Sequence, residues 1–326
     1  MRTPDSRAEV PLVRRIVAHD PDRSAALHMA MGSTPSGTPN QPDPAVTDLI
    51  DSTARRGLSI DLLVGAKIGG RLIAAWLAVE SQGRAALVLG PGPRVAGGPT
   101  ESVDAAVAAL QALRREAVHK GIALLEILLP PMDTAQGQIL ERAGFRRITR
   151  LIYLRQHCGM EEFPRSMGPG GMGADIDWQS YGPETHGLFA RALKASYVQS
   201  LDCPELDGLR DIDEVLAGHR SAGEFDPRFW WIAVRAKEPV GVILMSRLPT
   251  ATTMEVVYMG VAQPARGTGV ADALLDRAEA LARQSGVTTL ALAVDARNEP
   301  ARRLYSRRRF IETGQRDAWI ATPCAP

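Results

Sequence analysis

An order of apolar segments that occurs twice along the chain limits the fold more than any other feature. Each half has strand-like segments, then a long helix, a buried strand, a shorter helix and closing strand-like segments. These expectations follow from apolar residues that recur at every second position in strands and at every third or fourth position in helices. The helices are expected at about residues 102–119, 134–142, 269–285 and 298–308. The pattern predicts a mixed α/β fold.

Two pairs of residues align the halves without a gap. Gly121 and Gly286 are 165 positions apart, as are Phe145 and Phe310, and each residue follows a comparable helix. An ancient duplication explains this spacing economically. The alternative is that any two α/β domains share such punctuation.

A segment rich in glycine, proline and methionine, CGMEEFPRSMGPGGMG, separates the halves and has neither helical nor strand periodicity. Such a composition is typical of a linker. A chain of 326 residues also exceeds the usual size of one compact domain. We therefore expect a first domain at residues 1–158, a linker at 159–172 and a second domain at 173–326.

The most informative segment for function is the glycine-rich turn from Gln263 to Ala271, which follows a strand and opens a helix. A helix N-terminus carries unpaired backbone N–H groups and the positive end of the helix dipole, so a pyrophosphate binds well there. Gly267 and Gly269 allow close approach of the backbone to the anion and a positive φ. The turn fits neither the Walker A pattern nor G-x-G-x-x-G after a first strand, which disfavours nucleotide hydrolysis and dinucleotide binding.

Two motifs in the second half resemble those of the GNAT acetyltransferase superfamily. Arg266-x-x-Gly269-x-Ala271 matches the [R/Q]-x-x-G-x-[G/A] signature, and the stretch that begins at Asn298 contains the second hallmark of the family. The resemblance covers residues 230–310 and is greatest to tandem-domain members of the mycothiol synthase type. It implies two tandem GNAT-like domains, each a mostly antiparallel mixed sheet flanked by helices.

The same resemblance implies acetyl-coenzyme A as co-substrate. The turn would hold its pyrophosphate, and the preceding strand would pair with its pantetheine arm, much as a strand pairs with an added peptide. The cofactor-binding residues expected from the resemblance are Met259, Gly260, Val261, Arg266, Gly267, Thr268, Gly269, Val270, Ala271, Asn298 and Arg303. Asn298 is equally suited to cap the following helix, and Gly260 to form a β-bulge.

Acetyl transfer to an amine needs a base, because an alkylamine with a pKa near about 10 is protonated at neutral pH. Glu255, on the strand before the turn, matches the general-base glutamate of several family members. Tyr305 matches the tyrosine that commonly protonates the leaving thiolate, and its phenol has the required donor. A backbone N–H of residues 259–261 would stabilise the oxyanion. The alternatives are a solvated glutamate on a half-exposed strand and a tyrosine that merely packs on an amphipathic helix.

The helix after the last buried strand is strongly basic, and its arginines are Arg302, Arg303, Arg307, Arg308 and Arg309. A solvated face is the usual meaning of such a run. Arg303 is the first candidate to reach the cofactor phosphates. Arg309 stands where the family usually has glycine, and a left-handed conformation there would cost about 1 kcal/mol.

The first half lacks these groups when it is aligned at the same spacing of 165. The opposed pairs are Glu101 and Arg266, Asp104 and Gly269, and Leu140 and Tyr305. Two carboxylates would repel a diphosphate, and a leucine has no proton to donate. We expect a degenerate, catalytically silent first domain that shapes or orients the second. The alternative is that the glycines at residues 90–98 form an altered ligand pocket in this domain.

The acceptor is expected near the early helices of the second half and the loop between them. Asp202 or Glu205 in that loop would attract an ammonium group, although a polar loop without such a role is the commoner case. The leading acceptor is a primary amine of a small molecule, and the second is a protein N-terminus or lysine. A non-catalytic coenzyme A sensor or scaffold is the alternative of another class, and the presence of both Glu255 and Tyr305 favours an enzyme.

Composition argues against several other functions. Lys and Arg total 38 against 37 Asp and Glu, so no net field gathers nucleic acid or an anionic membrane. Neither a secretory signal nor a membrane span is expected, which favours a cytoplasmic protein. Cys158, Cys203 and Cys324 have no CxxC spacing and the histidines are isolated, so we expect neither a disulfide framework nor a metal site.

Overall fold

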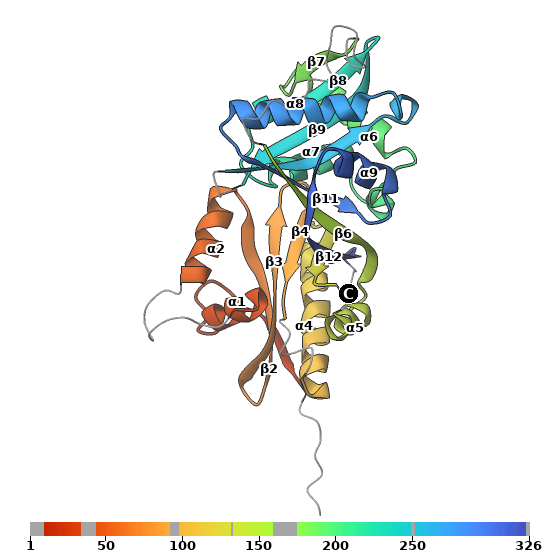
Figure 1. Cartoon of the computed structure of the whole chain (residues 1–326). Coiled ribbons are helices and arrows are strands. Elements are labelled where there is room, and N and C mark those ends of the chain that lie inside the picture. The colour runs from red at the N-terminus through yellow and green to blue at the C-terminus, as the bar shows by residue number, and fades with distance from the viewer. Residues whose placement is uncertain are drawn as a thin grey trace, which may run out of the picture. The chain divides into compact units, whose positions relative to one another are not determined.

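The computed structural model describes residues 10–33, 44–91, 98–131, 133–158, 175–248 and 252–323. The chain separates into two compact units: Met1–Ile148 with Asp317–Pro326, and Thr149–Arg316. Figure 1 colours most of the first unit red to yellow and most of the second green to blue. The predicted linker at 159–172 lies outside the described residues.

The first unit is a mixed sheet flanked by helices. Its elements are β1 (Leu12–Arg15), α1 (Arg23–Met31), α2 (Pro44–Arg55), β2 (Ser59–Ile68), β3 (Arg71–Ser81), β4 (Ala85–Leu89), α4 (Thr100–His119), β5 (Leu124–Leu129), α5 (Thr134–Arg142) and the end of β12 (Ile311–Ala321). The strands lie in the order β1-β2-β3-β4-β5-β12. β4 and β5 are parallel, and the other pairs described are antiparallel.

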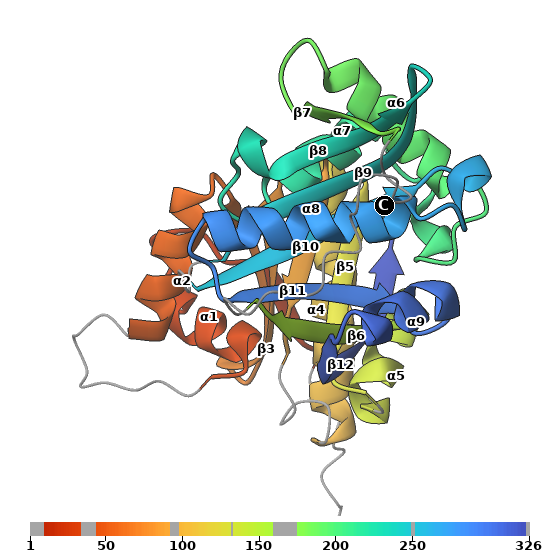
Figure 2. The same cartoon turned by 45° about the horizontal axis from the view of Figure 1, so that its top comes forward.

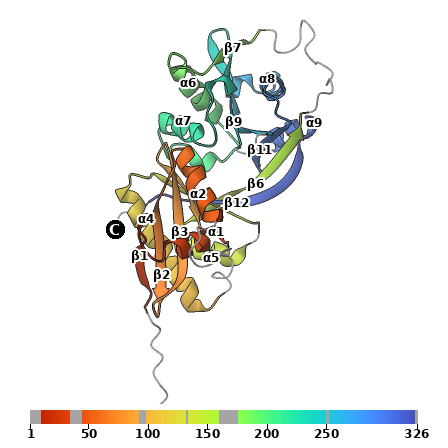
Figure 3. The ribbon, with the colours of Figure 1, turned by 90° about the vertical axis from the view of Figure 1, so that its left-hand side faces the viewer.

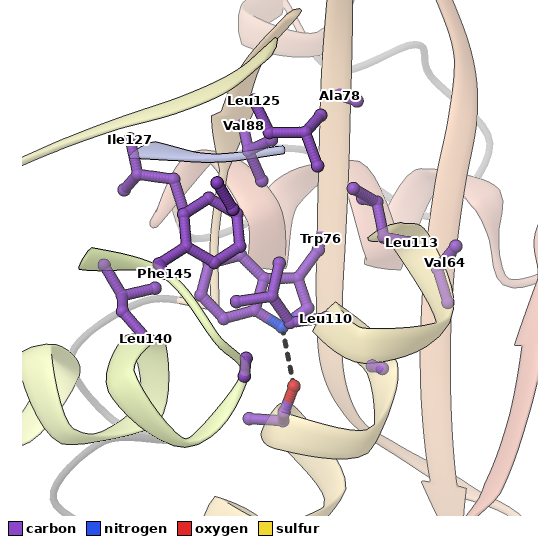
Figure 4. Packing of buried hydrophobic residues seen from close by; sticks show 14 of the residues in the cluster. Val64, Trp76, Ala78, Val88, Leu110, Leu113, Leu125, Ile127, Leu140 and Phe145 are labelled. Carbon is purple, nitrogen blue, oxygen red and sulfur yellow. Dashed lines mark hydrogen bonds between the residues drawn. The ribbon is translucent and has the colours of Figure 1, made fainter. Parts of the chain in front are cut away.

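A tryptophan lies at the centre of this unit's core. Trp76 of β3 is fully buried among side chains of α4, β5 and the segment after α5 (Figure 4). Its indole N–H donates to the Ala106 carbonyl at 2.9 Å, so the one polar atom of the ring is satisfied. Alanines on the inner side of α4, among them Ala105 and Ala109, leave room for the ring. The helix therefore packs close to the sheet along its first half.

The second unit has the same architecture. Its elements are the greater part of β6 (Arg146–His157), β7 (Asp177–Ser180), α6 (His186–Tyr197), α7 (Ile212–Arg220), β8 (Trp230–Arg235), β9 (Glu238–Arg247), β10 (Thr253–Val261), α8 (Val270–Gln284), β11 (Thr289–Asp295), α9 (Glu299–Arg307) and the start of β12. The strands lie in the order β12-β6-β11-β10-β9-β8-β7. β10 and β11 are parallel, whereas β7, β8 and β9 are paired antiparallel, as are β9 with β10 and β11 with β6.

Helices cover both faces of the second sheet. In β8, Trp230, Ile232 and Val234 alternate onto the face under α6 and α7, and Ala233 points to the opposite face under α8. This period of two buries both faces of the strand. Figure 2 shows α8 in front of the sheet and running nearly along the strands, and Figure 3 shows α6 and α8 on opposite sides of β9. None of the helices among the described residues combines the length and the apolar character needed to span a bilayer.

The predicted repeat of element order is confirmed. From β1 to β6 and from β7 to β12, strands and α-helices follow in the same sequence, and four of the predicted helices, α4, α5, α8 and α9, are present within two residues of their expected bounds. Gly121 and Gly286, which follow α4 and α8, both have φ of 68°. The N–H groups of Phe145 and Phe310 close equivalent turns onto residues five positions earlier. The mixed α/β fold with two similar halves is therefore as predicted, and the strands of both halves belong to one twelve-stranded sheet among the described residues.

Arg309 adopts the left-handed conformation expected of it, with φ of 61°. The aligned residue in the first unit is Gly144, whose φ is 83°. Because a side chain is strained in this region, the second unit tolerates a cost of about 1 kcal/mol that the first avoids. The helix thus ends at a left-handed residue in both units, which is glycine in the first unit and arginine in the second.

Each half of the sequence contributes its last strand to the unit formed by the other half. The sequence did not predict this arrangement. Residues Leu151–His157 of β6 pair with β11 of the second unit, and residues Asp317–Ala321 of β12 pair with β5 of the first. The units therefore differ from the expected domains 1–158 and 173–326 by these two strands. The alternation of apolar residues predicts which side chains of a strand are buried, but it does not specify the sheet that buries them.

Candidate functional site

A pocket of about 610 Å³ opens in the second unit where two parallel strands separate. The ladder between β10 and β11 runs from Thr253 and Thr289 to Glu255 and Ala291. Beyond it, residues 256–261 of β10 and 292–294 of β11 line the pocket. Strands that part in this way expose backbone N–H and C=O groups to a ligand.

A β-bulge lies in the pocket wall. The pairing of β10 with β9 shifts between Val256 and Tyr258, so Val257 is an extra residue on β10. Val256 packs in the cluster under α8, whereas Tyr258 packs under α6. The bulge thus places Val256 and Tyr258, which are two positions apart, on opposite faces of the sheet.

The predicted turn lines the pocket at the start of α8. Gly267 has φ of 76° and Gly269, the N-cap residue of α8, has φ of 84°. Both glycines line the pocket, as does Ala271 in the first helical turn. Since Gly269 has no side chain with which to cap the helix, the N–H groups of the first turn are presented to the pocket. The positive φ expected of these glycines is confirmed.

The side chain of Arg266 points to protein carbonyls rather than to the turn's N–H groups. It donates to the carbonyls of Ser196, Val198 and Gln199 at 2.8–3.0 Å, and to that of Val261 at 3.2 Å. Three of these acceptors lie at the end of α6, where the helix dipole favours a cation. Arg266 therefore joins α6 to the turn and to the end of β10.

Gly260 is required by a helix of the protein itself. A Cβ atom at this position would lie 2.5 Å from Ser196 Oγ and 2.8 Å from Tyr258 Oη. Those two oxygens are hydrogen-bonded at 2.7 Å. The close approach predicted at Gly260 is therefore made by α6. The neighbouring Met259 and Val261 line the pocket from β10.

Tyr305 and Asn298 both line the pocket from the α9 side. Tyr305 is buried and packs against Phe310, with ring centroids 5.5 Å apart. Burial raises the pKa of the Tyr305 phenol, so the group keeps its proton at neutral pH. The Asn298 side chain accepts a hydrogen bond from the Ala301 N–H at 3.3 Å. Asn298 therefore caps α9, which was one of its two expected roles.

The arginine placed at the pocket is not the one that the sequence favoured. Arg303 pairs with Glu299 on the same helix at 3.1 Å and is not among the residues that line the pocket. Arg307 lines it and lies 3.3 Å from Asp272 in the first turn of α8. Helical spacing alone did not separate the two arginines, because Arg303 follows the pocket-lining Pro300 by three positions just as Arg307 follows Leu304.

Three predicted residues lie near the pocket without lining it. Thr268 donates its hydroxyl hydrogen to the Ala265 carbonyl at 2.8 Å, and the Val270 side chain is fully buried in the core. Only their backbone is placed to meet a ligand. Glu255 is half-buried, one residue before the part of β10 that lines the pocket.

The loop after α6 is fastened to the end of β11 by a polar network that the sequence analysis missed. Arg297 donates to both oxygens of Glu205 at 2.6 and 2.9 Å and to buried Asp295 at 2.7 Å. Asp295 also accepts from the Cys203 N–H at 3.1 Å. Arg297 holds the pKa of Glu205 below its usual range. The Glu205 carboxylate is thus committed to an ion pair.

Asp202 lies in the same loop and lines the pocket. One oxygen accepts from the Asp295 N–H at 3.0 Å. Its charge acts on the Tyr305 phenol and adds to the rise in the pKa of that group. Of the two acidic residues expected near an acceptor, Asp202 alone lines the pocket. Among the described residues, no cluster of three His, Cys, Asp or Glu side chains is arranged to hold a metal.

The first unit differs at each equivalent position. α4 begins at Thr100, so Glu101 and Asp104 are helical where the second unit has the open turn. Leu140 is fully buried in the core. The last pair of the parallel ladder between β4 and β5 is Leu87 and Glu126, which places an apolar side chain where β10 has Glu255.

The glycine-rich stretch of the first unit is described only in part. Gly90 has φ of 128° and a Cβ atom there would lie 2.4 Å from the Ala75 carbonyl oxygen. Residues 92–97 lie outside the described residues. The described part thus gives Gly90 a packing role within the first unit.

Comparisons with known proteins agree with this architecture. The model of the acetyltransferase (GNAT) family matches residues 195–310. A mycothiol acetyltransferase of Beutenbergia cavernae is 36% identical over 89 residues, which are 26% of this chain and 29% of that protein. The match thus spans less than a third of that relative's length.

Two solved structures share the fold over nearly the whole chain. A GCN5-related N-acetyltransferase from Sphaerobacter thermophilus has 17% identity and a TM-score of 0.60, with 97% of each chain covered. A tandem GNAT protein from the clavulanic acid biosynthesis pathway has 15% identity and a TM-score of 0.52, covering 97% of this chain and 100% of that one. At such identities the likeness shows the fold, which is that of tandem GNAT proteins.

Proposed function

We propose that the second unit, in which residues 195–310 match the model of the acetyltransferase (GNAT) family, transfers the acetyl group of acetyl-coenzyme A to a primary amine of a small molecule. The observation that carries this proposal is the pocket between the parted strands β10 and β11. It is bounded by the N–H groups of the turn before α8 and by Tyr305. The N–H groups of the turn would bind the diphosphate of the cofactor. The exposed edge of β10 would bind the arm that carries the thioester.

In this proposal the residues of β10 act on the amine and on the thioester carbonyl. Glu255 takes the ammonium proton, directly or through water, as the amine enters from the sheet face opposite α8. A backbone N–H of residues 259–261 then stabilises the charge that develops on the carbonyl oxygen. The amine attacks the carbonyl carbon, the C–S bond breaks, and the nitrogen releases its second proton to water as the amide forms.

Tyr305 completes the reaction by donating its phenolic proton to the coenzyme A thiolate. Its place in the pocket wall supports this role, and water then returns a proton to the tyrosinate. The first unit is proposed to be catalytically silent, since Leu87 and Leu140 replace the base and the acid. The match to a mycothiol acetyltransferase supports acetyl transfer as the activity of the chain.

A substitution at Ala271 tests the cofactor site. Ala271→Glu places a carboxylate in the first turn of α8, where a negative charge favours the helix but repels a diphosphate. Calorimetry should show weaker binding of acetyl-coenzyme A by at least tenfold, while Ala271→Gln controls for size. Glu101→Ala in the first unit should leave the affinity unchanged.

Turnover distinguishes an enzyme from a sensor. Thiol release from acetyl-coenzyme A should depend on an added small-molecule amine and should stop in the Glu255→Gln, Tyr305→Phe double variant. Tight binding without thiol release across a broad amine panel would contradict the enzyme. Acetylation of added peptides in preference to metabolites would contradict the small-molecule acceptor.

A further inference from the structure

The sheet face that contains Glu255 continues onto β6, a strand from the first half of the chain. Leu290, Leu292 and Val294 of β11 are buried under α8, so Ala291 and Ala293 lie on the opposite face. In register, Glu255 pairs with Ala291, and Ala291 pairs with Arg155. The three residues form one row across β10, β11 and β6.

A second row lies beside the first. Ala293 lines the pocket and pairs in register with Tyr153 of β6. Residues two positions apart on a strand are separated by about 7 Å, so Tyr153 and Arg155 are neighbours on this face. Burial raises the pKa of the Tyr153 phenol, on which Arg316 and Glu255 act with opposite sign. Both charges therefore lie near enough to Tyr153 to affect the pKa of its phenol.

The apolar cluster of described residues under α6 and α7 does not extend over these rows. The cluster under α6 and α7 takes its sheet residues from β8, β9 and β10, and includes none from β11 or β6. Small alanine side chains on β11 therefore form the floor between Glu255 on one side and Tyr153 and Arg155 on the other. Two strand intervals of about 4.8 Å separate the rims of this floor by about 10 Å at the backbone.

Two arginines near these rows, Arg155 and Arg316, lack an acidic partner within the part of the chain that the structure describes. Among the described residues, no carboxylate forms an ion pair with Arg155 or Arg316, both of which are exposed. By contrast, Arg191, Arg228 and Arg297 in the same unit each pair with an acid. The guanidinium group of Arg155 on the rim opposite Glu255 gives the face a negative and a positive end, and the Arg316 charge acts on Tyr153 beside it.

The geometry points to an acceptor amine that also carries an anionic group several bonds from its nitrogen, with Arg155 as the residue that binds this group. This inference rests on the proposed function, because it takes Glu255 as the base. The ammonium end lies toward Glu255 and the pocket, and the anionic end lies over the alanine floor toward Arg155. A guanidinium binds a carboxylate or a phosphate through two parallel N–H donors. Arg316 adds to the positive field.

Matched pairs of acceptors test the inference. 4-Aminobutyrate is compared with 4-aminobutyramide, 6-aminohexanoate with 6-aminohexanamide, and O-phosphoethanolamine with ethanolamine. The wild-type protein should favour the anionic member of a pair by about tenfold or more in kcat/KM, and the pair with the largest ratio distinguishes carboxylate from phosphate. Arg155→Gln should bring the ratio close to one without changing the KM for acetyl-coenzyme A. Arg155→Glu should favour 1,4-diaminobutane instead.

The control variant is Arg191→Gln, which removes an exposed, ion-paired arginine of α6. It should keep the wild-type preference, and equal ratios in the wild type and Arg155→Gln would overturn the inference. Calorimetry of the same pairs with protein saturated in coenzyme A separates this inference from the proposed function. If no acceptor is acetylated, the proposed function fails. The anion site then stands or falls on whether Arg155→Gln abolishes the affinity difference.

Discussion

Arg307 of α9 and Asp272 in the first turn of α8 face each other at the pocket, with Nη2 and Oδ2 3.3 Å apart. Both residues line the pocket. The carboxylate lies beside the turn proposed to hold a diphosphate, where a second negative charge opposes binding. Arg307 offsets that charge, so the pair sets the local potential that the cofactor meets.

Asp272→Asn should therefore lower the KM for acetyl-coenzyme A, and Arg307→Gln should raise it. The side chains are 39% and 63% exposed, so solvent screening limits each change to on the order of 1 kcal/mol, or a factor of about three to ten. Both effects should shrink in high salt. Steady-state kinetics at two ionic strengths measures them, and shifts of the same sign in the two variants would contradict the assignment.

Arg266→Ala should destabilise the second unit as well as weaken cofactor binding. The guanidinium donates to four backbone carbonyls that join α6, β10 and the turn. Hydrogen bonds from a charged donor contribute about 1.5–3 kcal/mol when buried, and this partly exposed group should contribute about 1–2 kcal/mol. Thermal unfolding should show a Tm lower by several degrees. A variant with weaker binding and an unchanged Tm would mean that the side chain acts on the cofactor alone.

Glu255→Gln should reduce turnover most at low pH. An acceptor amine with a pKa near about 10 is almost fully protonated at pH 7, so attack requires transfer of its proton to a base. As the pH rises toward 10, the free amine becomes abundant and the deficit of the variant should shrink. The pH dependence of kcat/KM in both proteins measures this. A deficit that is the same at every pH would remove Glu255 from the role of base.

Tyr305→Phe should slow the reaction by about a hundredfold without loss of fold, since phenylalanine preserves the packing against Phe310. Burial raises the pKa of this phenol above its usual value of 10.0, so its proton is retained in alkaline solution. The wild-type rate should therefore show no decline attributable to Tyr305 up to about pH 10. Single-turnover kinetics checks the first expectation and an alkaline rate profile the second. Equal rates for the two proteins would assign the proton donor elsewhere.

Local patterns in the sequence were sufficient for the helices and the repeat. Glycine, proline and the apolar periods mark α4, α5, α8 and α9 to within two residues, because helix ends depend on nearby residues. The left-handed Arg309 followed from alignment with glycine-terminated helices. The pocket-forming turn was likewise predictable, since its glycines act through their own backbone.

Side-chain partners distant in the sequence were not predictable in this way. Arg266 was expected at the phosphate but donates to the end of α6. Glu205 was expected at the acceptor but pairs with Arg297, 92 positions away. Gly260 was expected to make room for a ligand, but the close contact that excludes a side chain there is with Ser196 of α6. Each of these interactions depends on how helices pack on a sheet, which no local period specifies.

The exchange of β6 gives a prediction about fragments. Ile152 and Leu154 of β6 are buried in the core of the second unit, and the Cys158 N–H donates to the Thr288 carbonyl at 2.7 Å. A fragment of residues 173–326 lacks these groups and exposes the backbone edge of β11, so it should unfold non-cooperatively or aggregate. A fragment of residues 149–316 retains the strand and should unfold cooperatively while binding acetyl-coenzyme A. Calorimetric unfolding of both fragments measures the difference. Equal stability would show that β6 is dispensable, and the acceptor face proposed on it would then have no structural basis.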